Sequence, residues 1–363
     1  MSDSLRPAPA AADPSPNASP QPLSEGAEEP VLEIRRLSID YGLGPGALHA
    51  VVAADLTLRR RQVLGLAGES GSGKSTLAYG ATRLLREPGV VAGGEVLLNP
   101  REGAPTDLLA ASERQLRAIR WSEISMVLQS ALNALNPVVR IGKEFDDILR
   151  AHSRLSRKAR RRRAGELLEM VGIHPSRLSD HPHQLSGGQR QRVMIALALA
   201  LEPQVVIMDE PTTALDVVTQ REIIEELIEL RDRLGFALLF ITHDLSLLIE
   251  LADEIAVMYA GRIVERAPAE ELYRSPRHPY TYGLLHSFPP LHGEVPPMTG
   301  IPGSPPDLAS IPAGCAFHPR CPYAMDRCTR AVPALDLLEG QGRQVACFLH
   351  DGQAAVPSEL ALS

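Results

Sequence analysis

Gly68-Glu69-Ser70-Gly71-Ser72-Gly73-Lys74-Ser75 follows the pattern G-x-x-x-x-G-K-[ST]. An apolar run ends at Leu66 just before it, and a helix is predicted from about Lys74. The glycines let backbone N–H groups turn inward around a phosphate, and the helix presents its positive end to that phosphate. Lys74 supplies a charge for β/γ-phosphates, and the Ser75 hydroxyl can ligate Mg²⁺. We therefore predict that this loop, with Thr76, binds a nucleotide.

A second element fits the same chemistry. Val205-Val206-Ile207-Met208-Asp209-Glu210 is an apolar strand that ends in two acids. Beside a phosphate loop, the Asp209 carboxylate can hold Mg²⁺ through water, and Glu210 can orient and deprotonate an attacking water. The competing interpretation is a strand that merely ends in solvated acids. The upstream phosphate loop argues against it.

The order of elements predicts an α/β fold. Residues 31–41 alternate apolar and polar side chains like a half-buried strand, and residues 51–60 repeat that pattern. Residues 130–195 read as mostly helical, with Ser156 as the cap of a helix that ends before Gly172. Two short apolar strands, 205–209 and 237–242, then flank a helical segment. Strands that alternate with helices indicate a parallel sheet covered on both faces.

Composition excludes several classes of protein. Lys+Arg is 37 and Asp+Glu is 44, so a net charge of −7 argues against uniform attraction to nucleic-acid backbones. The longest apolar run, Val193 to Leu201, is far shorter than the roughly 20 residues that span a bilayer. Residues 1–30 are rich in Pro and Ala, and we expect a disordered arm. Four cysteines without an export signal favour a reducing compartment.

Leu185-Ser186-Gly187-Gly188-Gln189 resembles the signature motif of ABC-type ATPases. A chance match is on the order of 10⁻⁶ per position from average residue usage. Further segments resemble family motifs in the family's order, over about residues 31–285. They are an adenine-stacking Tyr41, Gln129 of the Q-loop, Ala214-Leu215-Asp216 of the D-loop, and the switch histidine His243.

This resemblance implies a P-loop NTPase of ABC type. The expected architecture is a parallel-sheet core with an N-terminal antiparallel β subdomain, a helical insert at about 130–195 and a C-terminal extension over 286–363. Two such domains pair head to tail in the family, so that Ser186, Gly187, Gly188 and Gln189 of one subunit cover the nucleotide on the other. Glu210, His243 and Lys74 are implied to carry hydrolysis, while Gln129 is implied to ligate Mg²⁺ and sense the γ-phosphate. Asp216 is implied to contact the nucleotide site.

Finer features resemble the ATPase subunits of bacterial oligopeptide, dipeptide and nickel importers. They are QSALNALNPV (129–138), HPHQLSGGQRQRV (181–193), SPRHPYTYGLL (275–285) and IPGSPPDL (301–308). The resemblance implies an identical or related second ATPase subunit, two integral membrane permease subunits and an external solute-binding protein. It places the chain at the cytoplasmic face of the inner membrane and implies no nucleic-acid partner.

Two other functions compete with the importer. One is an ABC ATPase that acts on ribosomes or DNA, but translation-type members usually carry two cassettes, and this chain has one copy of each motif. DNA-repair members separate the phosphate loop from the signature by long coiled coils, and no sustained heptads occur between Gly73 and Leu185. The other is a regulatory module without hydrolysis, against which the presence of Glu210 and His243 argues.

Four cysteines lie in the extension, at Cys315, Cys321, Cys328 and Cys347. Their spacing is wider than the pairs typical of structural zinc, and four thiolates also suit a [4Fe–4S] cluster. From the residues alone, zinc, a cluster and free thiols stay open. The tail of this chain, which includes GCAFHPRCP (314–322), resembles tails in the importer subfamily that are associated with such a cluster. The resemblance therefore favours the cluster.

Overall fold

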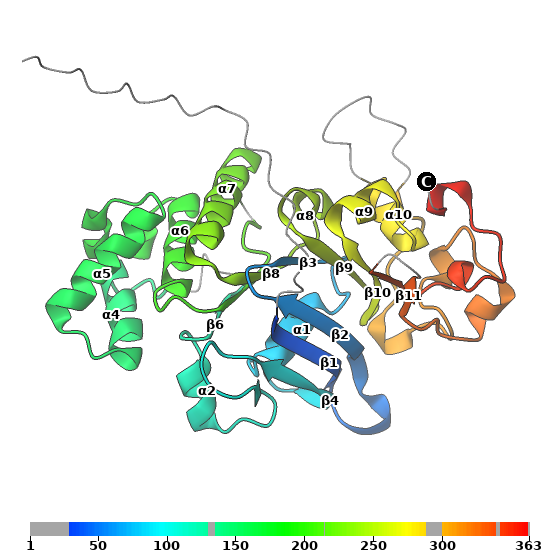
Figure 1. Cartoon of the computed structure of the whole chain (residues 1–363), viewed down its shortest axis with the longest axis horizontal. Helices are drawn as coiled ribbons and strands as arrows, with labels where there is room; N and C mark the ends of the chain where they lie inside the picture. The colour runs from blue at the N-terminus through cyan, green and yellow to red at the C-terminus, as the bar shows by residue number, and fades with distance from the viewer. Residues whose placement is uncertain (1–28, 130–134, 214, 288–299, 339–341, 362–363) are drawn as a thin grey trace, which may run out of the picture.

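A computed structural model of the chain describes residues 29–129, 135–213, 215–287, 300–338 and 342–361. Within these ranges, one sheet has the strand order β11-β12-β10-β9-β3-β8-β7-β6 and a second has the order β2-β1-β4-β5 (Figure 1). The strands of the larger sheet are β3 (Val63–Ala67), β6 (Ile124–Val127), β7 (Val205–Asp209), β8 (Ala237–Ile241), β9 (Glu254–Tyr259), β10 (Arg262–Pro268), β11 (Asp336–Leu338) and β12 (Arg343–Val345).

The centre of the larger sheet is parallel, as predicted. β3 pairs in parallel with β8 and β9, and β7 pairs in parallel with β6 and β8. Successive side chains of a strand point to opposite faces, so Val206 and Met208 join the core beneath the helices while Val205 and Ile207 join the core on the other side. Because both faces are buried, these strands read as unbroken apolar runs.

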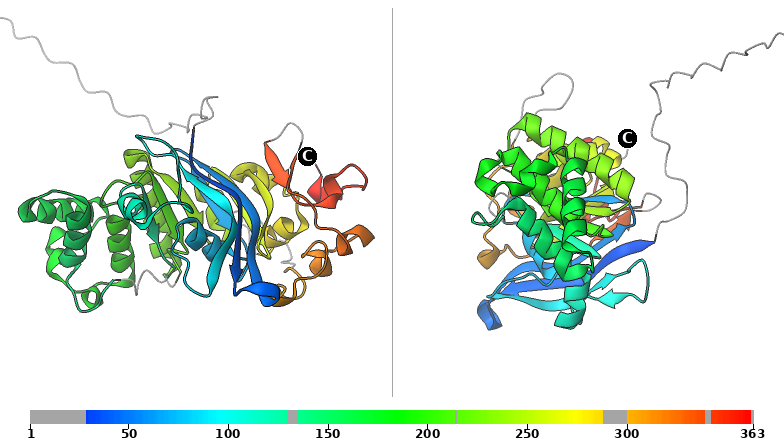
Figure 2. Two further views of the ribbon diagram at one scale, coloured as in Figure 1. Left: turned by 90° about the horizontal axis from the view of Figure 1, so that it is seen from below. Right: turned by 90° about the vertical axis from the view of Figure 1, so that its left-hand side faces the viewer.

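The smaller sheet is antiparallel and packs across the second core. Its strands are β1 (Pro30–Tyr41), β2 (Leu48–Arg59), β4 (Gly89–Leu98) and β5 (Thr106–Asp107), paired around β1. Its apolar side chains share the second core with alternate residues of the larger sheet and with Leu77 of α1 (Lys74–Ala81). The helix that follows the phosphate loop therefore lies between the two sheets (Figures 1 and 2).

Apart from α2, the remaining helices form two groups. Those from α4 to α6 make one end of the molecule, and α7 to α10 cover the larger sheet (Figure 1). The bounds are α2 (Glu113–Ile119), α4 (Ile141–His152), α5 (Arg157–Met170), α6 (Gly187–Ala198), α7 (Val217–Leu234), α8 (Leu245–Leu251), α9 (Ala269–Arg274) and α10 (Pro279–Leu285). No helix within the described ranges is long and apolar enough to cross a membrane.

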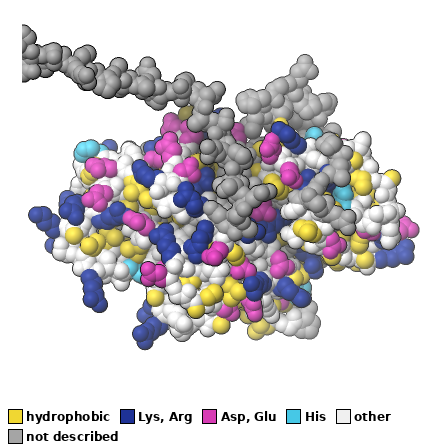
Figure 3. Space-filling view, viewed as in Figure 1, with side chains coloured by type: hydrophobic (Ala, Val, Ile, Leu, Met, Phe, Trp, Pro, Cys, Tyr) yellow, Lys and Arg dark blue, Asp and Glu magenta, His cyan; other side chains and the backbone are white. Residues whose placement is uncertain are grey.

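The basic run 157–163 forms the first two turns of α5. Arg160 pairs with Asp146 at 2.6 Å and Arg163 with Glu202 at 2.6 Å, whereas Arg157, Lys158 and Arg161 are exposed. Lys and Arg side chains are prominent at this end of the molecule (Figure 3). The run is thus largely the solvated face of a helix.

The C-terminal extension continues the larger sheet. β12 pairs antiparallel with β10, and β11 pairs with β12. A buried ion pair supports this junction, with Arg343 Nη2 3.2 Å from Glu265 Oε1. Hydrophobic periodicity did not predict these strands, because a strand of three residues is too short to show it. The expected arm 1–30 lies outside the described residues except for its last two positions.

Candidate nucleotide site

The phosphate loop needs glycine at two positions for steric reasons. Gly68 has φ 150° and Gly73 has φ 104°, conformations that residues with a side chain rarely adopt. A Cβ on Gly68 would lie 2.3 Å from the carbonyl oxygen of Met258, and one on Gly73 would lie 2.4 Å from that of Ala50. Ser70, Gly71 and Ser72 complete the turn between β3 and α1. At Gly68 and Gly73 the loop therefore packs backbone against backbone. The helix start that follows favours an anion.

Lys74 lies folded within this loop. Its Nζ donates hydrogen bonds to the carbonyl oxygens of Gly68 at 2.8 Å and Glu69 at 2.9 Å. Burial lowers the pKa of Lys74, while the nearby carboxylates of Glu210 and Asp209 oppose that effect. The ammonium is thus a buried charge bonded to carbonyl oxygens, which phosphate oxygens can replace.

Ser75 and Asp209 meet at the start of α1. Ser75 Oγ donates to Asp209 Oδ1 at 3.0 Å. Asp209 is completely buried, and its Oδ2 has no hydrogen-bond partner. Burial is the main cause that raises the pKa of this carboxyl. A buried carboxylate oxygen without a partner beside a hydroxyl fits Mg²⁺, because this cation prefers oxygen ligands and takes few of them from protein.

Glu210, Gln129 and His243 come together from the ends of three neighbouring strands. Gln129 Nε2 donates to Glu210 Oε2 at 2.9 Å, and His243 Nδ1 lies 3.2 Å from Glu210 Oε1. Burial acts to raise the pKa of Glu210, but hydrogen bonds with His243, Thr213 and Gln129 outweigh it and lower the pKa. Glu210 also has φ 46°, a strained conformation of a kind that clusters at functional sites.

Tyr41 and Thr76 meet at the side of α1. Tyr41 ends β1, and its hydroxyl lies 3.2 Å from Thr76 Oγ1. The phenol group thus contacts the first turn of α1, the helix that follows the phosphate loop.

The signature residues and Asp216 cap helices. Ser186 Oγ accepts from the Gln189 backbone N–H at 3.2 Å, and Gln189 Oε1 accepts from the Ser186 N–H at 3.1 Å. Gly187 and Gly188 open α6, which stands apart from α1 (Figure 1). Asp216 Oδ1 accepts from the Thr219 N–H at 2.9 Å and caps α7. One copy of the chain therefore does not bring its signature to its own phosphate loop. Ala214 lies outside the described residues.

Comparison with known proteins identifies the family. The family model described as ABC transporter matches residues 51–213, and that described as Oligopeptide/dipeptide transporter, C-terminal region, matches residues 264–328. A protein of Brucella abortus (strain 2308), provisionally named a peptide import ATP-binding protein, is 43% identical over 314 residues, which cover 86% of this chain and 93% of the relative. The chain belongs to the ABC transporter ATP-binding family.

Solved cassettes share the fold. A dimeric ATP-binding cassette in a post-hydrolysis state, bound to ADP and Pi, is 27% identical with a TM-score of 0.57, and the match covers 66% of this chain and 98% of that one. The cbiO1 cassette from Clostridium perfringens, part of an ABC transporter complex, is 28% identical with a TM-score of 0.57, covering 68% of this chain and 91% of that one. As a member of this family, the chain is an ATPase that energises an importer and uses ATP and Mg²⁺.

The four cysteines of the ABC ATPase line one small cavity in its C-terminal extension. The backbone N–H of Cys315 donates to the carbonyl oxygen of Cys328 at 2.8 Å. Burial is the main cause that raises the pKa of Cys321 to about 11 and of Cys347 to about 12. Thiols are the type of ligand that an iron–sulfur cluster or zinc takes, and four of them line this cavity. Within the described ranges, however, no three His, Cys, Asp or Glu side chains are placed to hold a metal ion.

Three residues that contact the site were not predicted from the sequence. Thr213 Oγ1 donates to Glu210 Oε2 at 3.0 Å, and its position three residues later in a turn was an available signal. Tyr280 accepts a hydrogen bond from the Glu69 N–H, and Arg320 forms an ion pair with the Glu69 carboxylate. No local pattern indicates these two, since each contact spans more than 200 residues of sequence.

Proposed function

We propose that this ATPase energises the import of di- or oligopeptides. The observation that carries the proposal is the convergence of Gln129, Glu210 and His243 in a chain that also matches the oligopeptide/dipeptide C-terminal region. The Brucella relatives, provisionally named peptide import ATP-binding proteins, support a peptide as the cargo. Import of nickel by the same kind of subunit is the alternative, and stimulation of ATP hydrolysis in reconstituted vesicles distinguishes it from peptide import.

The residues take separate roles in hydrolysis. The phosphate loop and Lys74 hold the β- and γ-phosphates, and Tyr41 stacks on the adenine. Ser75 and Asp209 would hold Mg²⁺, with Gln129 as a further proposed ligand. When bound, the cation neutralises charge on the phosphates. Glu210 takes a proton from water as the water oxygen bonds to the γ-phosphorus and the bond to the β-phosphate oxygen breaks. His243 orients Glu210 and the γ-phosphate.

A second ATPase subunit completes the pocket. Because α6 stands apart from α1, Ser186, Gly187, Gly188 and Gln189 of one subunit would cover the nucleotide held by the other, with Asp216 at the junction. A capped helix N-terminus of this kind favours an anion. The dimeric cassette bound to ADP and Pi supports this pairing. ATP binding closes the pair and hydrolysis reopens it.

The closing and reopening of the ATPase pair would drive a membrane permease. We propose two integral membrane permease subunits that contact the helical insert at about 130–195, and an external solute-binding protein that delivers the peptide. The ATPase would then be peripheral, at the cytoplasmic face of the inner membrane. The proposed domains are an N-terminal arm (1–30), the ATPase domain (31–285) and the extension (286–363).

The extension is proposed to hold a [4Fe–4S] cluster through Cys315, Cys321, Cys328 and Cys347. Convergence of all four thiols on one cavity supports it, and the cluster would act as a structural cross-link. Iron and sulfide analysis of protein purified without oxygen is the test. Stoichiometric iron, acid-labile sulfide and a visible absorbance that Cys347→Ser removes would support the cluster. Colourless protein with zinc or with four free thiols would contradict it.

Purification from native membranes tests the importer. We expect the tagged chain to copurify with two integral membrane subunits, and reconstituted vesicles to hydrolyse ATP faster when a binding protein loaded with peptide is added. If only a nickel-loaded binding protein stimulates hydrolysis, the cargo is nickel and not a peptide. Association with ribosomes or DNA instead of membrane subunits would contradict the importer.

A further inference from the structure

An ion pair between a buried arginine and a partly exposed glutamate joins the phosphate loop to the C-terminal extension. Arg320 Nη1 donates to Glu69 Oε2 at 2.7 Å, and Nη2 donates to Glu69 Oε1 at 3.0 Å. The Arg320 side chain is only 6% exposed, and the Glu69 side chain 24%. Two parallel hydrogen bonds of this kind fix orientation as well as charge. The two residues are 251 positions apart in sequence.

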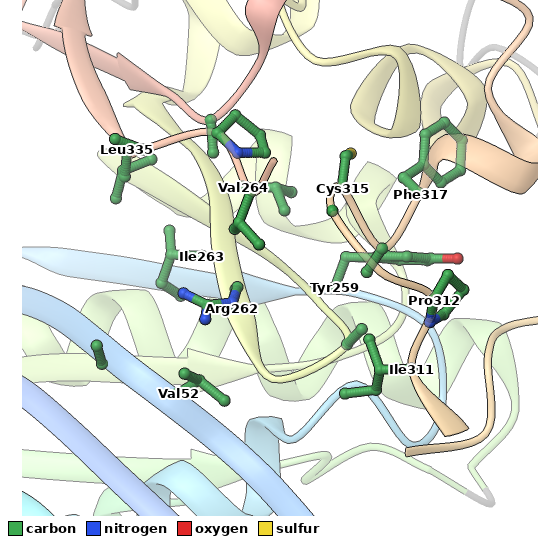
Figure 4. Close-up of a pocket in the computed structure, with 18 of the residues that line it drawn as sticks. Val52, Tyr259, Arg262, Ile263, Val264, Ile311, Pro312, Cys315, Phe317 and Leu335 are labelled. Carbon is green, nitrogen blue, oxygen red and sulfur yellow. The ribbon is translucent and has the colours of Figure 1, made fainter. Parts of the chain in front are cut away.

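Arg320 is itself held in place by its surroundings. Its Nε donates to the carbonyl oxygen of Pro302 at 2.9 Å, and Nη1 also donates to the Tyr259 hydroxyl at 3.3 Å. The guanidinium lies 5.9 Å from the ring centres of both Tyr259 and Phe317. These two rings meet edge to face and lie beside Cys315 at one side of a cavity (Figure 4). A guanidinium with this many contacts has little freedom to leave Glu69.

Glu69 is held through three of its groups. Its backbone N–H donates to the Tyr280 hydroxyl at 2.8 Å, its carbonyl oxygen accepts from Lys74 at 2.9 Å, and its carboxylate accepts from Arg320. Lys74 is the residue that would turn to the phosphates of a nucleotide. Once it turns, the contacts that remain at Glu69 are those with Tyr280 and Arg320 and a hydrogen bond within the loop, from the Ser72 N–H to the Glu69 carbonyl oxygen at 3.2 Å.

The negative charge of Glu69 gives its pairing with Arg320 a second role. Glu69 is the acidic residue within the loop 68–75, beside the place where a polyphosphate would bind. An uncompensated carboxylate at that position would repel the phosphates, most strongly where water is excluded. The guanidinium of Arg320 cancels that charge.

We propose that Arg320 is a positioning residue for nucleotide binding, which holds and neutralises Glu69 and so makes ATP affinity depend on the C-terminal extension. This inference rests on the proposed phosphate site. Arg320 immediately precedes Cys321. A rearrangement of the cysteine cavity would therefore displace Arg320, which contacts the phosphate loop at Glu69.

The test measures the affinity of the full chain for the non-hydrolysable analogue AMP-PNP with Mg²⁺. The variants are Arg320→Gln, Glu69→Gln and the double variant. Arg327→Gln is the matched control, because Arg327 lies in the same extension, donates to Asp351 Oδ1 at 2.8 Å and packs on Phe348. We expect Arg320→Gln to bind about tenfold more weakly, and the double variant to recover most of that loss because the unpaired carboxylate is gone. Arg327→Gln should bind like the wild type.

Salt separates the electrostatic role from a merely structural one. Repulsion by an unpaired Glu69 is screened, so the deficit of Arg320→Gln should shrink as salt rises. If Arg320→Gln fails to fold, Arg320→Lys replaces it, with an intermediate loss expected because the charge stays and the two-pronged geometry goes. Wild-type affinity in Arg320→Gln, or an equal loss in Arg327→Gln, overturns the inference. A wild-type protein that binds no AMP-PNP contradicts the phosphate site instead.

Discussion

The side-chain amide of Gln129 donates a 2.9 Å hydrogen bond to the carboxylate of Glu210, and this bond ties the end of β6 to the end of β7. Gln129 lies where the chain leaves the larger sheet toward α4. We propose that Gln129 also senses the γ-phosphate, and a residue that contacts both the nucleotide and the base can report the state of the nucleotide to the helical end of the molecule. This connection is the structural basis that we infer for coupling between hydrolysis and transport.

Replacing Glu210 tests its role as the base. Glu210→Gln keeps the size and most hydrogen bonds of the side chain but cannot accept the proton. We expect phosphate release to fall at least about 100-fold while nucleotide affinity changes little. Glu270→Gln, at an exposed acid on α9, is the control and should keep full activity. Unchanged turnover in Glu210→Gln would refute the assignment.

Lys74→Ala tests the phosphate site. The buried ammonium is bonded to two carbonyl oxygens of the loop, and its loss removes the charge that would meet the β- and γ-phosphates. We expect binding of a fluorescent ATP analogue to be abolished. Lys143→Ala, at an exposed lysine that pairs with Asp147, should bind normally. Tight binding by Lys74→Ala would rule out the proposed role of this loop.

Acid should weaken the fold through His278. Burial, together with the neighbouring His350, lowers the pKa of His278 from 6.5 to about 3. Below pH 6.5 the unfolded chain therefore binds more protons than the folded one, and stability falls as pH drops toward 3. From pH 7.5 to 5.0 this amounts to about 2 kcal/mol.

His278→Asn isolates this effect, because Asn can still accept the hydrogen bond that His278 Nδ1 accepts from the Tyr280 N–H. Urea unfolding at both pH values should show a drop about 2 kcal/mol smaller in the variant than in the wild type. His350 remains in both proteins, so its contribution cancels. An equal drop in the two proteins would exclude His278 as the cause.

Arg343→Ala should destabilise the junction between the core sheet and the extension. It leaves the carboxylate of Glu265, which is 1% exposed, without its ion pair. Breaking a buried pair costs about 3–5 kcal/mol, whereas the exposed Arg274–Glu270 pair contributes at most about 1 kcal/mol. Chemical denaturation of Arg343→Ala and Arg274→Ala should therefore differ clearly. Equal unfolding free energies would show that the buried pair does not support the junction.

Local chemistry explains what could be predicted from the sequence. The glycine loop, the cap Ser156 and the short buried strands each depend on residues close in sequence, and the structure contains them all. The contact of Arg320 with Glu69 and the pairing of β12 with β10 depend on tertiary packing between distant segments. Neither has a periodic or spaced pattern, so the part played by the extension became visible only in the structure.

The pairing of two cassettes around the nucleotide is tested most directly by the rate of ATP hydrolysis per chain across a dilution series, with mass measured by light scattering. We predict that the rate per chain falls as ATP-bound dimers dissociate, or is absent throughout when a different subunit is the required partner. A constant rate from a species with the mass of one chain, down to the lowest concentration, would contradict the shared pocket.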